Sequence, residues 1–267
     1  EGVYTFFLNA QGRILADANL YALEDYVLID TEPAARRKLY EHLDKYIIAD
    51  DVILEDVTDA MATIALEGPT AEDVLVEAQM TVPESAYQIV AAKDLLIAST
   101  SLAGTGGFLL FVPVEQKTEI LELLERSGAV AADEADLDLL RTENRIPRFG
   151  LDFGEDLIAH ETGQMRAVHF SKGCYLGQEI VERVRSRGHL NKKLYPLEFE
   201  GEEAPAQGTR VLAGTKDAGR VTSAFLMPDG QRSVGFAVVR TDLATEQLTV
   251  QGLPVTLREY VASPVGS

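Results

Sequence analysis

The chain has 267 residues, of which 46% are hydrophobic and 25% are charged, and its formal net charge is −19. This length and composition are typical of a globular protein with one large domain or two smaller ones. A surface this acidic repels phosphate backbones, so we expect no stable binding of nucleic acid. The chain has no run of 18 apolar residues and its first residues lack a signal-peptide pattern. We therefore predict a soluble, cytoplasmic protein that does not enter the membrane.

The N-terminal part of the sequence predicts a mixture of strands and helices. Two apolar-rich runs, residues 3–8 and 13–21, flank Asn9-Ala10-Gln11-Gly12, which is typical of a β-hairpin. Residues 34–46 carry apolar side chains at helical spacing and predict an amphipathic helix. The other predicted strands are residues 26–30, 52–57, 62–67, 88–92, 95–100 and 108–112, and the other predicted helices are residues 70–78, 115–127 and 135–143. Strands and helices in this order favour an α+β fold with mixed sheets.

The sequence changes character near residue 193. The segment 141–191 is irregular and rich in charged and polar residues, with a short helix predicted after Gly177. Six short strands split by Gly and Pro follow, at residues 194–199, 209–213, 218–225, 233–240, 247–251 and 255–260. Short strands at close spacing predict a small barrel or sandwich. We therefore predict an α+β domain over residues 1–192 and a C-terminal β-barrel over residues 193–267.

Cys174 is the single cysteine of the chain. No internal disulfide can form, and one thiol cannot hold an iron–sulfur cluster, which usually takes four cysteine ligands. The histidines near it match no compact metal motif, so we predict no metal site. Gly173 and Gly177 bracket the thiol in a tight turn before a helix, and Lys172 lies next to it. A helix N-terminus and a nearby cation favour the reactive thiolate, although a lone cysteine is as often buried and inert.

The octapeptide Lys172-Gly173-Cys174-Tyr175-Leu176-Gly177-Gln178-Glu179 resembles, at all its fixed positions, the K-G-C-Y-x-G-Q-E signature of the YgfZ family. This family belongs to the glycine-cleavage T-protein superfamily. The passage from Arg141 to Asp152 is similar to the superfamily's R-x-E-x-x-x-P-x-x-G-x-D motif. Further stretches with a resemblance are residues 44–56, 104–113 and 219–223, so the likeness spans nearly the whole chain.

The resemblance implies a tetrahydrofolate-binding domain that supports assembly or repair of [4Fe–4S] enzymes, including those that modify tRNA. Its partners would be folate and iron–sulfur enzymes or assembly proteins, and we expect a monomer. Cys174 and Lys172 would carry the thiol chemistry. Glu143 would hold the pterin ring, since a carboxylate accepts two parallel hydrogen bonds from an amino-pyrimidine edge. The remaining candidate folate-site residues are Tyr175, Gln178, Glu179 and Arg183.

Three alternatives stay open at this point. Glu143 could instead be a surface carboxylate paired with a nearby arginine. The basic stretch around Arg183 could bind the glutamate tail of folate or another anion, or it could be a solvated linker. The chain could also be a folate-dependent one-carbon transferase, or an adaptor without a working folate site. The Y-T-G-E and R-E-K-D runs of active T-proteins are missing from the matching segments, which argues against an aminomethyltransferase.

Overall fold

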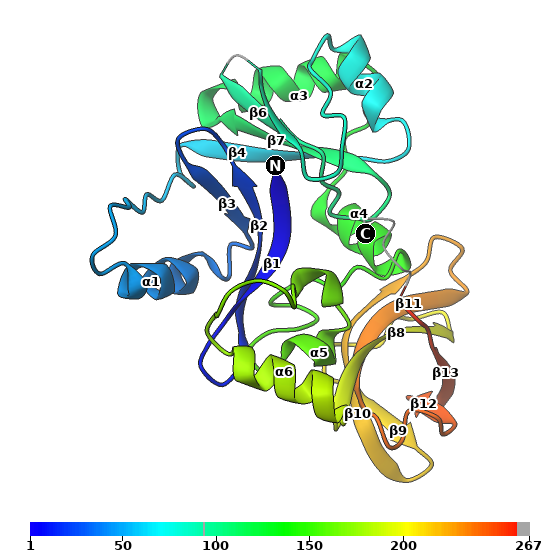
Figure 1. Cartoon of the computed structure of the whole chain (residues 1–267). Coiled ribbons are helices and arrows are strands. Elements are labelled where there is room, and N and C mark those ends of the chain that lie inside the picture. Colours follow the sequence, from blue (N-terminus) through cyan, green and yellow to red (C-terminus); the bar gives the residue numbers. More distant parts are fainter. Residues whose placement is uncertain (93, 261–267) are drawn as a thin grey trace.

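The computed structural model describes residues 1–92 and 94–260. Two antiparallel sheets form the N-terminal part, and a barrel lies at the other end of the molecule (Figure 1). The expected arrangement of an α+β part with sheets and helices followed by a β-barrel is confirmed. Among the described residues, no helix is both long and apolar enough to cross a bilayer.

The first sheet has the strand order β1 (Gly2–Leu8), β2 (Ile14–Ala22), β3 (Val27–Thr31). The predicted hairpin between β1 and β2 is confirmed. Its turn is held by the Asn9 side chain, whose Oδ1 accepts hydrogen bonds from the backbone N–H of Gln11 (2.9 Å) and Arg13 (3.0 Å). Tyr4, Phe6 and Leu8 are buried on one face of β1, because alternate side chains of a strand point the same way.

The second sheet has the order β4 (Met61–Glu67), β7 (Gly107–Pro113), β6 (Leu95–Ala98), β5 (Ile89–Ala92). Its outer face packs on α2 (Ala71–Glu77) and α3 (Lys117–Arg126), and the short helix η1 (Val114–Gln116) leads into α3. Its other face meets the first sheet, where the rings of Tyr21 and Phe111 pack edge to face with centroids 5.7 Å apart. The two sheets are therefore joined by one apolar contact layer.

Helix α1 (Arg36–Tyr46) confirms the predicted helix and projects from the body with the segment that follows it (Figure 1). The strand predicted at residues 52–57 is wrong, because this segment has no regular structure. Val52 and Ile53 are 59% and 92% exposed, and none of the described strands pairs with them. A β-prone sequence forms a strand only where a partner strand accepts its hydrogen bonds.

The segment between the sheets and the barrel contains α4 (Glu134–Glu143), α5 (Ala159–Thr162), η2 (Met165–Ala167) and α6 (Gln178–Arg187). Helix α4 starts at a capping box, in which the Asp133 side chain accepts a hydrogen bond from the Asp136 backbone N–H (3.0 Å) and the Asp136 side chain accepts one from the Asp133 backbone N–H (3.1 Å). Helices α5 and α6 lie together beside the lower end of β1 (Figure 1).

The described residues after Asn191 form a closed antiparallel barrel of six strands, in the order β10-β11-β8-β13-β12-β9. The barrel interior is filled by the side chains of Leu197, Phe199, Val211, Val221 and Val239. Closure leaves no unpaired edge for another strand to add to. The strands are β8 (Lys192–Glu200), β9 (Arg210–Ala213), β10 (Lys216–Leu226), β11 (Arg232–Arg240), β12 (Leu248–Val250) and β13 (Leu253–Leu257).

Candidate functional site

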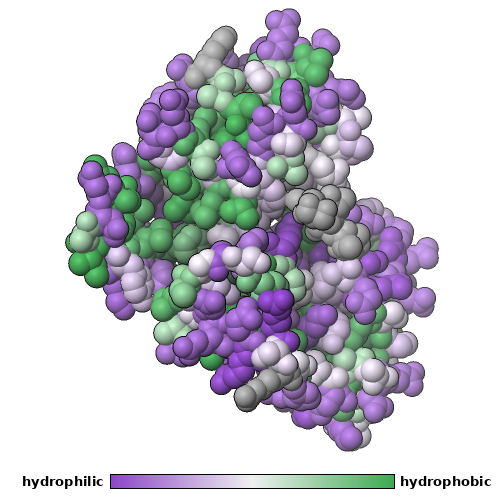
Figure 2. All heavy atoms as spheres, viewed as in Figure 1, coloured by the Kyte–Doolittle hydropathy of each residue, from purple (hydrophilic) through white to green (hydrophobic). Residues whose placement is uncertain are grey.

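A cavity of about 530 Å³ lies where the two sheets meet α4 and the start of α1. This volume is in the range of small-molecule sites in proteins. Apolar side chains gather in the hollow between α1 and the body of the molecule (Figure 2). The polar side chains that line the cavity are Tyr4, Asp17, Asn19, Asp30, Thr31, Glu32, Arg36, Thr58, Thr63, Tyr87, Thr100, Ser101, Asp138, Arg141, Arg148 and Arg166.

Two carboxylates on the first sheet form one wall of the cavity. Asp17 of β2 accepts a hydrogen bond from the Tyr4 hydroxyl (2.8 Å), and Asp30 of β3 accepts one from the Asn19 side-chain amide (3.1 Å). Protein atoms surround the Asp17 carboxyl densely although it keeps some solvent contact through the cavity, and this burial raises its pKa to about 6. Burial also raises the pKa of Asp30. Both carboxyl groups can accept hydrogen bonds from a flat heterocycle, and Asp17 can also exchange a proton near pH 6.

Arg166, in η2, lies at the same side of the cavity. Its guanidinium group stacks over the Tyr4 ring at 4.7 Å from the ring centroid, and its side chain is exposed. Its positive charge lowers the pKa of the nearby Tyr4 and Tyr87, but burial outweighs this effect and raises both. The cavity therefore combines a carboxylate wall with a cationic rim.

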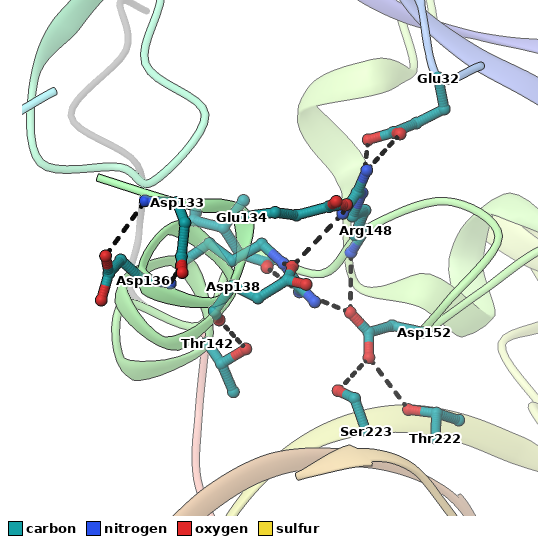
Figure 3. Close-up of polar contacts among 12 residues, drawn as sticks. Glu32, Asp133, Glu134, Asp136, Asp138, Thr142, Arg148, Asp152, Thr222 and Ser223 are labelled. Atoms are coloured by element: carbon teal, nitrogen blue, oxygen red, sulfur yellow. Dashed lines mark hydrogen bonds and ion pairs between the residues drawn. The ribbon is translucent and has the colours of Figure 1, made fainter. Parts of the chain in front are cut away.

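Arg148, which also lines the cavity, forms ion pairs with acidic side chains (Figure 3). Its guanidinium group binds Glu32 of β3 with two hydrogen bonds, Nε–Oε1 at 2.9 Å and Nη2–Oε2 at 3.0 Å. It also donates to Glu134 at the start of α4 (2.6 Å). Such a two-pronged pair holds a fixed geometry, so Arg148 ties the end of the first sheet to α4.

Asp152 joins this network to the barrel. Its Oδ2 accepts hydrogen bonds from Arg141 Nη1 (2.7 Å) and from the Arg148 backbone N–H (2.8 Å). Its Oδ1 accepts from the hydroxyl groups of Thr222 (3.3 Å) and Ser223 on β10 (Figure 3). Both Arg141 and Asp152 are buried, so their charges need partners: Asp152 pairs with Arg141, and Arg141 also pairs with Asp138.

Glu143 does not lie among the residues that line the cavity. Its side chain is 44% exposed and pairs with Arg232 of β11 at 3.6 Å. Successive helical residues turn by about 100°, so a residue two positions after the inward-facing Arg141 points away from the cavity. The structure thus puts the expected pterin-holding carboxylate at the contact between α4 and the barrel.

The thiol loop lies at the far end of β1 from the cavity. Gly177 precedes α6 with φ of 82°, and a Cβ there would approach the Asn9 carbonyl oxygen to 2.7 Å. Cys174 is exposed, and Gln178 Oε1 accepts a hydrogen bond from the Tyr175 backbone N–H (3.3 Å). The N-terminus of α6 is therefore fixed against the β1–β2 turn, with the thiol at the surface beside it.

The structure brings some of the expected thiol-loop residues together and leaves others apart. Lys172 Nζ lies 4.4 Å from the centroid of the Tyr175 ring. Both line a small side pocket with Phe6 and Leu8. Glu179 and Arg183 point to solvent from α6, and none of these residues lines the main cavity. In the part of the chain that the structure describes, no group of three His, Cys, Asp or Glu side chains could hold a metal ion.

Asp17 and Asp30 are not among the site residues that the sequence predicts. The signal that could have found Asp17 is its position in β2, where Asp17 and Asn19 place polar groups on the same face of an otherwise apolar strand. That pattern alone does not show that the face borders a cavity, because an antiparallel sheet can also expose one polar face to water.

Comparison with known proteins identifies the family to which the chain belongs. Residues 1–172 match the family model described as GCVT N-terminal domain. The chain belongs to the GCVT, or T-protein, family. Residues 191–263 match the model described as CAF17, C-terminal beta-barrel domain. The N-terminal sheets and their cavity therefore lie within the residues that match the GCVT model, and the barrel lies within those that match the CAF17 model.

Individual family members agree with this assignment. The chain is 28% identical over 257 residues to an aminomethyltransferase from Caldanaerobacter subterraneus subsp. tengcongensis, covering 91% of this chain and 68% of the relative. It is 30% identical over 256 residues to one from Rubrobacter xylanophilus, covering 93% and 67%. The crystal structure of glycine cleavage system aminomethyltransferase T from Bartonella henselae shares the fold, with a TM-score of 0.86, 19% identity, and 98% and 76% of the two chains covered.

Proposed function

We propose that this protein binds tetrahydrofolate in the central cavity and supports the assembly or repair of [4Fe–4S] enzymes, including those that modify tRNA. The observation that carries the folate part is the pair of partly buried carboxyl groups, Asp17 and Asp30, on the wall of a cavity of about 530 Å³. A carboxylate is the natural partner of the amino-pyrimidine edge of a pterin. Asp17 takes the place that the sequence suggested for Glu143.

The iron–sulfur part of the proposal is supported by two independent features. The barrel matches the CAF17 model, and the thiol loop resembles the YgfZ signature at each of its fixed positions. Cys174 is exposed, so its thiol is accessible to another protein or to a cluster held by one. We assign Lys172 and Tyr175 to shaping the loop, Gln178 to fixing it, and Glu179 and Arg183 to the surface around it.

A second candidate function is a folate-dependent one-carbon transferase, because the relatives named above are aminomethyltransferases. It predicts that the purified protein converts tetrahydrofolate to methylene-tetrahydrofolate in the presence of an amine donor. A third candidate, an adaptor without folate, predicts no binding at all. A single titration of the protein with tetrahydrofolate distinguishes the adaptor from the other two.

The binding test uses Asp17→Asn and the matched Glu143→Gln as variants. Wild type should bind tetrahydrofolate saturably. Asp17→Asn should weaken binding about tenfold or more, the size expected for loss of a charge-assisted hydrogen bond. Glu143→Gln should bind like wild type because Glu143 lies away from the cavity. Equal loss in both variants would contradict the assignment to Asp17, and no binding by wild type would refute the folate proposal.

The cellular test concerns the thiol. The gene is deleted in its host, and the activity of a [4Fe–4S] tRNA methylthiotransferase is measured with plasmids that carry wild type, Cys174→Ala or Ser186→Ala. Ser186 is an exposed α6 residue and serves as a neighbouring control. We expect low activity in the deletion strain, restored by wild type and the control but not by Cys174→Ala. Normal cluster enzymes in the deletion strain would make the transferase the leading function.

A further inference from the structure

The segment that carries the thiol loop has a charge opposite to that of the rest of the chain. Residues 166–193 contain seven Lys and Arg against two Glu, whereas the whole chain has a net charge of −19. Helix α6, with Arg183 and Arg185, lies within this segment, and hydrophilic side chains gather over it in Figure 2. A local excess of positive charge on an acidic protein attracts negatively charged molecules to one face only.

Two aromatic rings that flank Cys174 in the chain each hold a cation. Lys172 Nζ lies 4.4 Å from the centroid of the Tyr175 ring, and the guanidinium carbon of Arg185 lies 4.1 Å from that of the Phe170 ring. Lys172, Cys174 and Arg185 are all exposed. A cation held over a ring loses part of its freedom, so these positive charges are positioned in advance beside the thiol.

Arg183 adds a third cation on the outward face of α6. Arg185 pairs with Glu182 at 3.7 Å, whereas Arg183 is exposed and, within residues 1–92 and 94–260, has no carboxylate within 4.0 Å. A helix rises about 1.5 Å per residue, so both arginines lie within about 10 Å of the N-terminus of α6. With Lys172 they outnumber the carboxylates of this helix, Glu179 and Glu182.

The exposed residues Phe170, Lys172, Cys174, Arg183 and Arg185 form an area that we call the thiol face. Its features fit a protein surface better than a small ligand. The side pocket that Lys172 also lines has a volume of about 10 Å³, which holds no more than one water molecule. Phe170 is 37% exposed, so the face offers an apolar contact among cations. Aromatic residues and arginine are enriched in contacts between proteins.

We propose that the thiol face docks an acidic protein that carries an iron–sulfur cluster, with Arg183 and Arg185 as the residues that recognise it. The inference rests on the proposed function and names the kind of partner that reaches Cys174. A cluster ligated by cysteine thiolates has a net negative charge, so these cations attract both the partner's acidic surface and its cluster. A nucleic acid is disfavoured, because its backbone would extend from this small face over the acidic remainder of the surface.

Cys174 is the single thiol of the chain, so its reactivity reports the charge around it. The test measures the rate of thiol–disulfide exchange with dithiobis(nitrobenzoate), which is a dianion, and with dithiodipyridine, which is neutral. In each reaction the Cys174 thiolate forms a mixed disulfide with one half of the reagent and releases the other half as a thiolate. The ratio of the two rates is divided by the same ratio for mercaptoethanol, which removes the intrinsic difference between the reagents.

We expect wild type to favour the dianion at about 0.1 M salt, where charges farther than about 10 Å away are screened. The double variant Arg183→Glu/Arg185→Glu should lower the corrected ratio about threefold, the effect of reversing two charges at roughly 10 Å. Arg183→Lys/Arg185→Lys keeps both charges and should keep the ratio. Arg210→Glu, on an exposed position of β9 in the barrel, should also leave it unchanged. Urea unfolding of each variant checks that it is folded.

Complementation of the deletion strain decides whether a partner uses the thiol face. Arg183→Glu/Arg185→Glu should fail to restore the [4Fe–4S] tRNA methylthiotransferase, whereas Arg183→Lys/Arg185→Lys and Arg210→Glu should restore it. The charge-reversed variant should still bind tetrahydrofolate as wild type does, because neither arginine lines the cavity. Loss of complementation with folate binding intact would then come from the surface charge and not from the folate site.

The outcomes separate this inference from the proposed function. If the charge-reversed variant restores the enzyme as wild type does, or if Arg210→Glu lowers the exchange ratio as much, the docking surface is refuted while the proposed function stands. Saturable binding of tRNA to wild type that the charge reversal abolishes would overturn the acidic protein in favour of RNA. If cluster enzymes stay normal in the deletion strain, the proposed function fails and the partner with it, whatever the exchange rates are.

Discussion

Replacing Asp17 with Asn measures directly how much unfolding free energy the protein loses by holding this carboxyl group at the cavity wall. Burial raises the pKa of Asp17 from 3.8 to about 6, so the folded protein holds this proton over a range in which the unfolded chain has released it. The stability that comes from the raised pKa is present below pH 3.8 and is lost as the pH rises through about 6. The full loss is about 3 kcal/mol of unfolding free energy.

Asparagine has nearly the same shape, keeps an oxygen that can accept the hydrogen bond from Tyr4, and carries no charge at any pH. Asp17→Asn should therefore be more stable than wild type at neutral pH. The difference should widen by about 1.4 kcal/mol between pH 5 and pH 7.5, which is the part of the linkage that falls in this interval. The protein would gain stability and lose folate affinity, as expected for a functional carboxylate held at a structural cost.

The assay is urea unfolding of wild type and Asp17→Asn at four pH values from 5 to 7.5. Asp242→Asn provides the control with the opposite sign, because the hydrogen bond from Arg240 lowers the pKa of the exposed Asp242. In wild type, the ionised Asp242 contributes stability at neutral pH and loses this contribution only in acid. The stability of Asp242→Asn relative to wild type should therefore not increase as the pH rises. A difference between Asp17→Asn and wild type that stays constant with pH would refute the reasoning.

Two further predictions concern the thiol loop and the domain contact. Gly177→Ala should destabilise the protein by about 2 kcal/mol or more in urea unfolding, because the new Cβ meets the Asn9 carbonyl oxygen. The control is Gly188→Ala, where the glycine also has a positive φ but a new Cβ would lie in open space. This control variant should lose only about 1 kcal/mol. Equal effects would mean that the turn does not anchor α6. Asp152→Ala should cost about 3 kcal/mol in the same assay, since the buried Arg141 would lose one of its two carboxylate partners and keep only Asp138. A loss below 1 kcal/mol would contradict a structural role for this pair.

The local pattern of the sequence was sufficient for most helices and strands. The hairpin at Asn9, the helix that ends at Tyr46 and the helix that ends at Glu143 were all predicted close to their observed bounds. Periodic burial and turn residues act over a few positions, so they can be read without knowing the rest of the fold. The strand predicted at residues 52–57 failed for the same reason, because whether a strand forms depends on a partner that the local sequence does not contain.

The thiol loop and the family likeness were visible in the sequence, because Cys174 and its neighbours are contiguous. The cavity was not, since its walls come from segments as far apart as Tyr4, Asp17 and Arg166. Tertiary packing decided that Asp17 and Asp30 border the cavity and that Glu143 pairs with the barrel. The physical reason is that a motif specifies which groups are available, whereas burial and charge pairing arise only when distant segments meet.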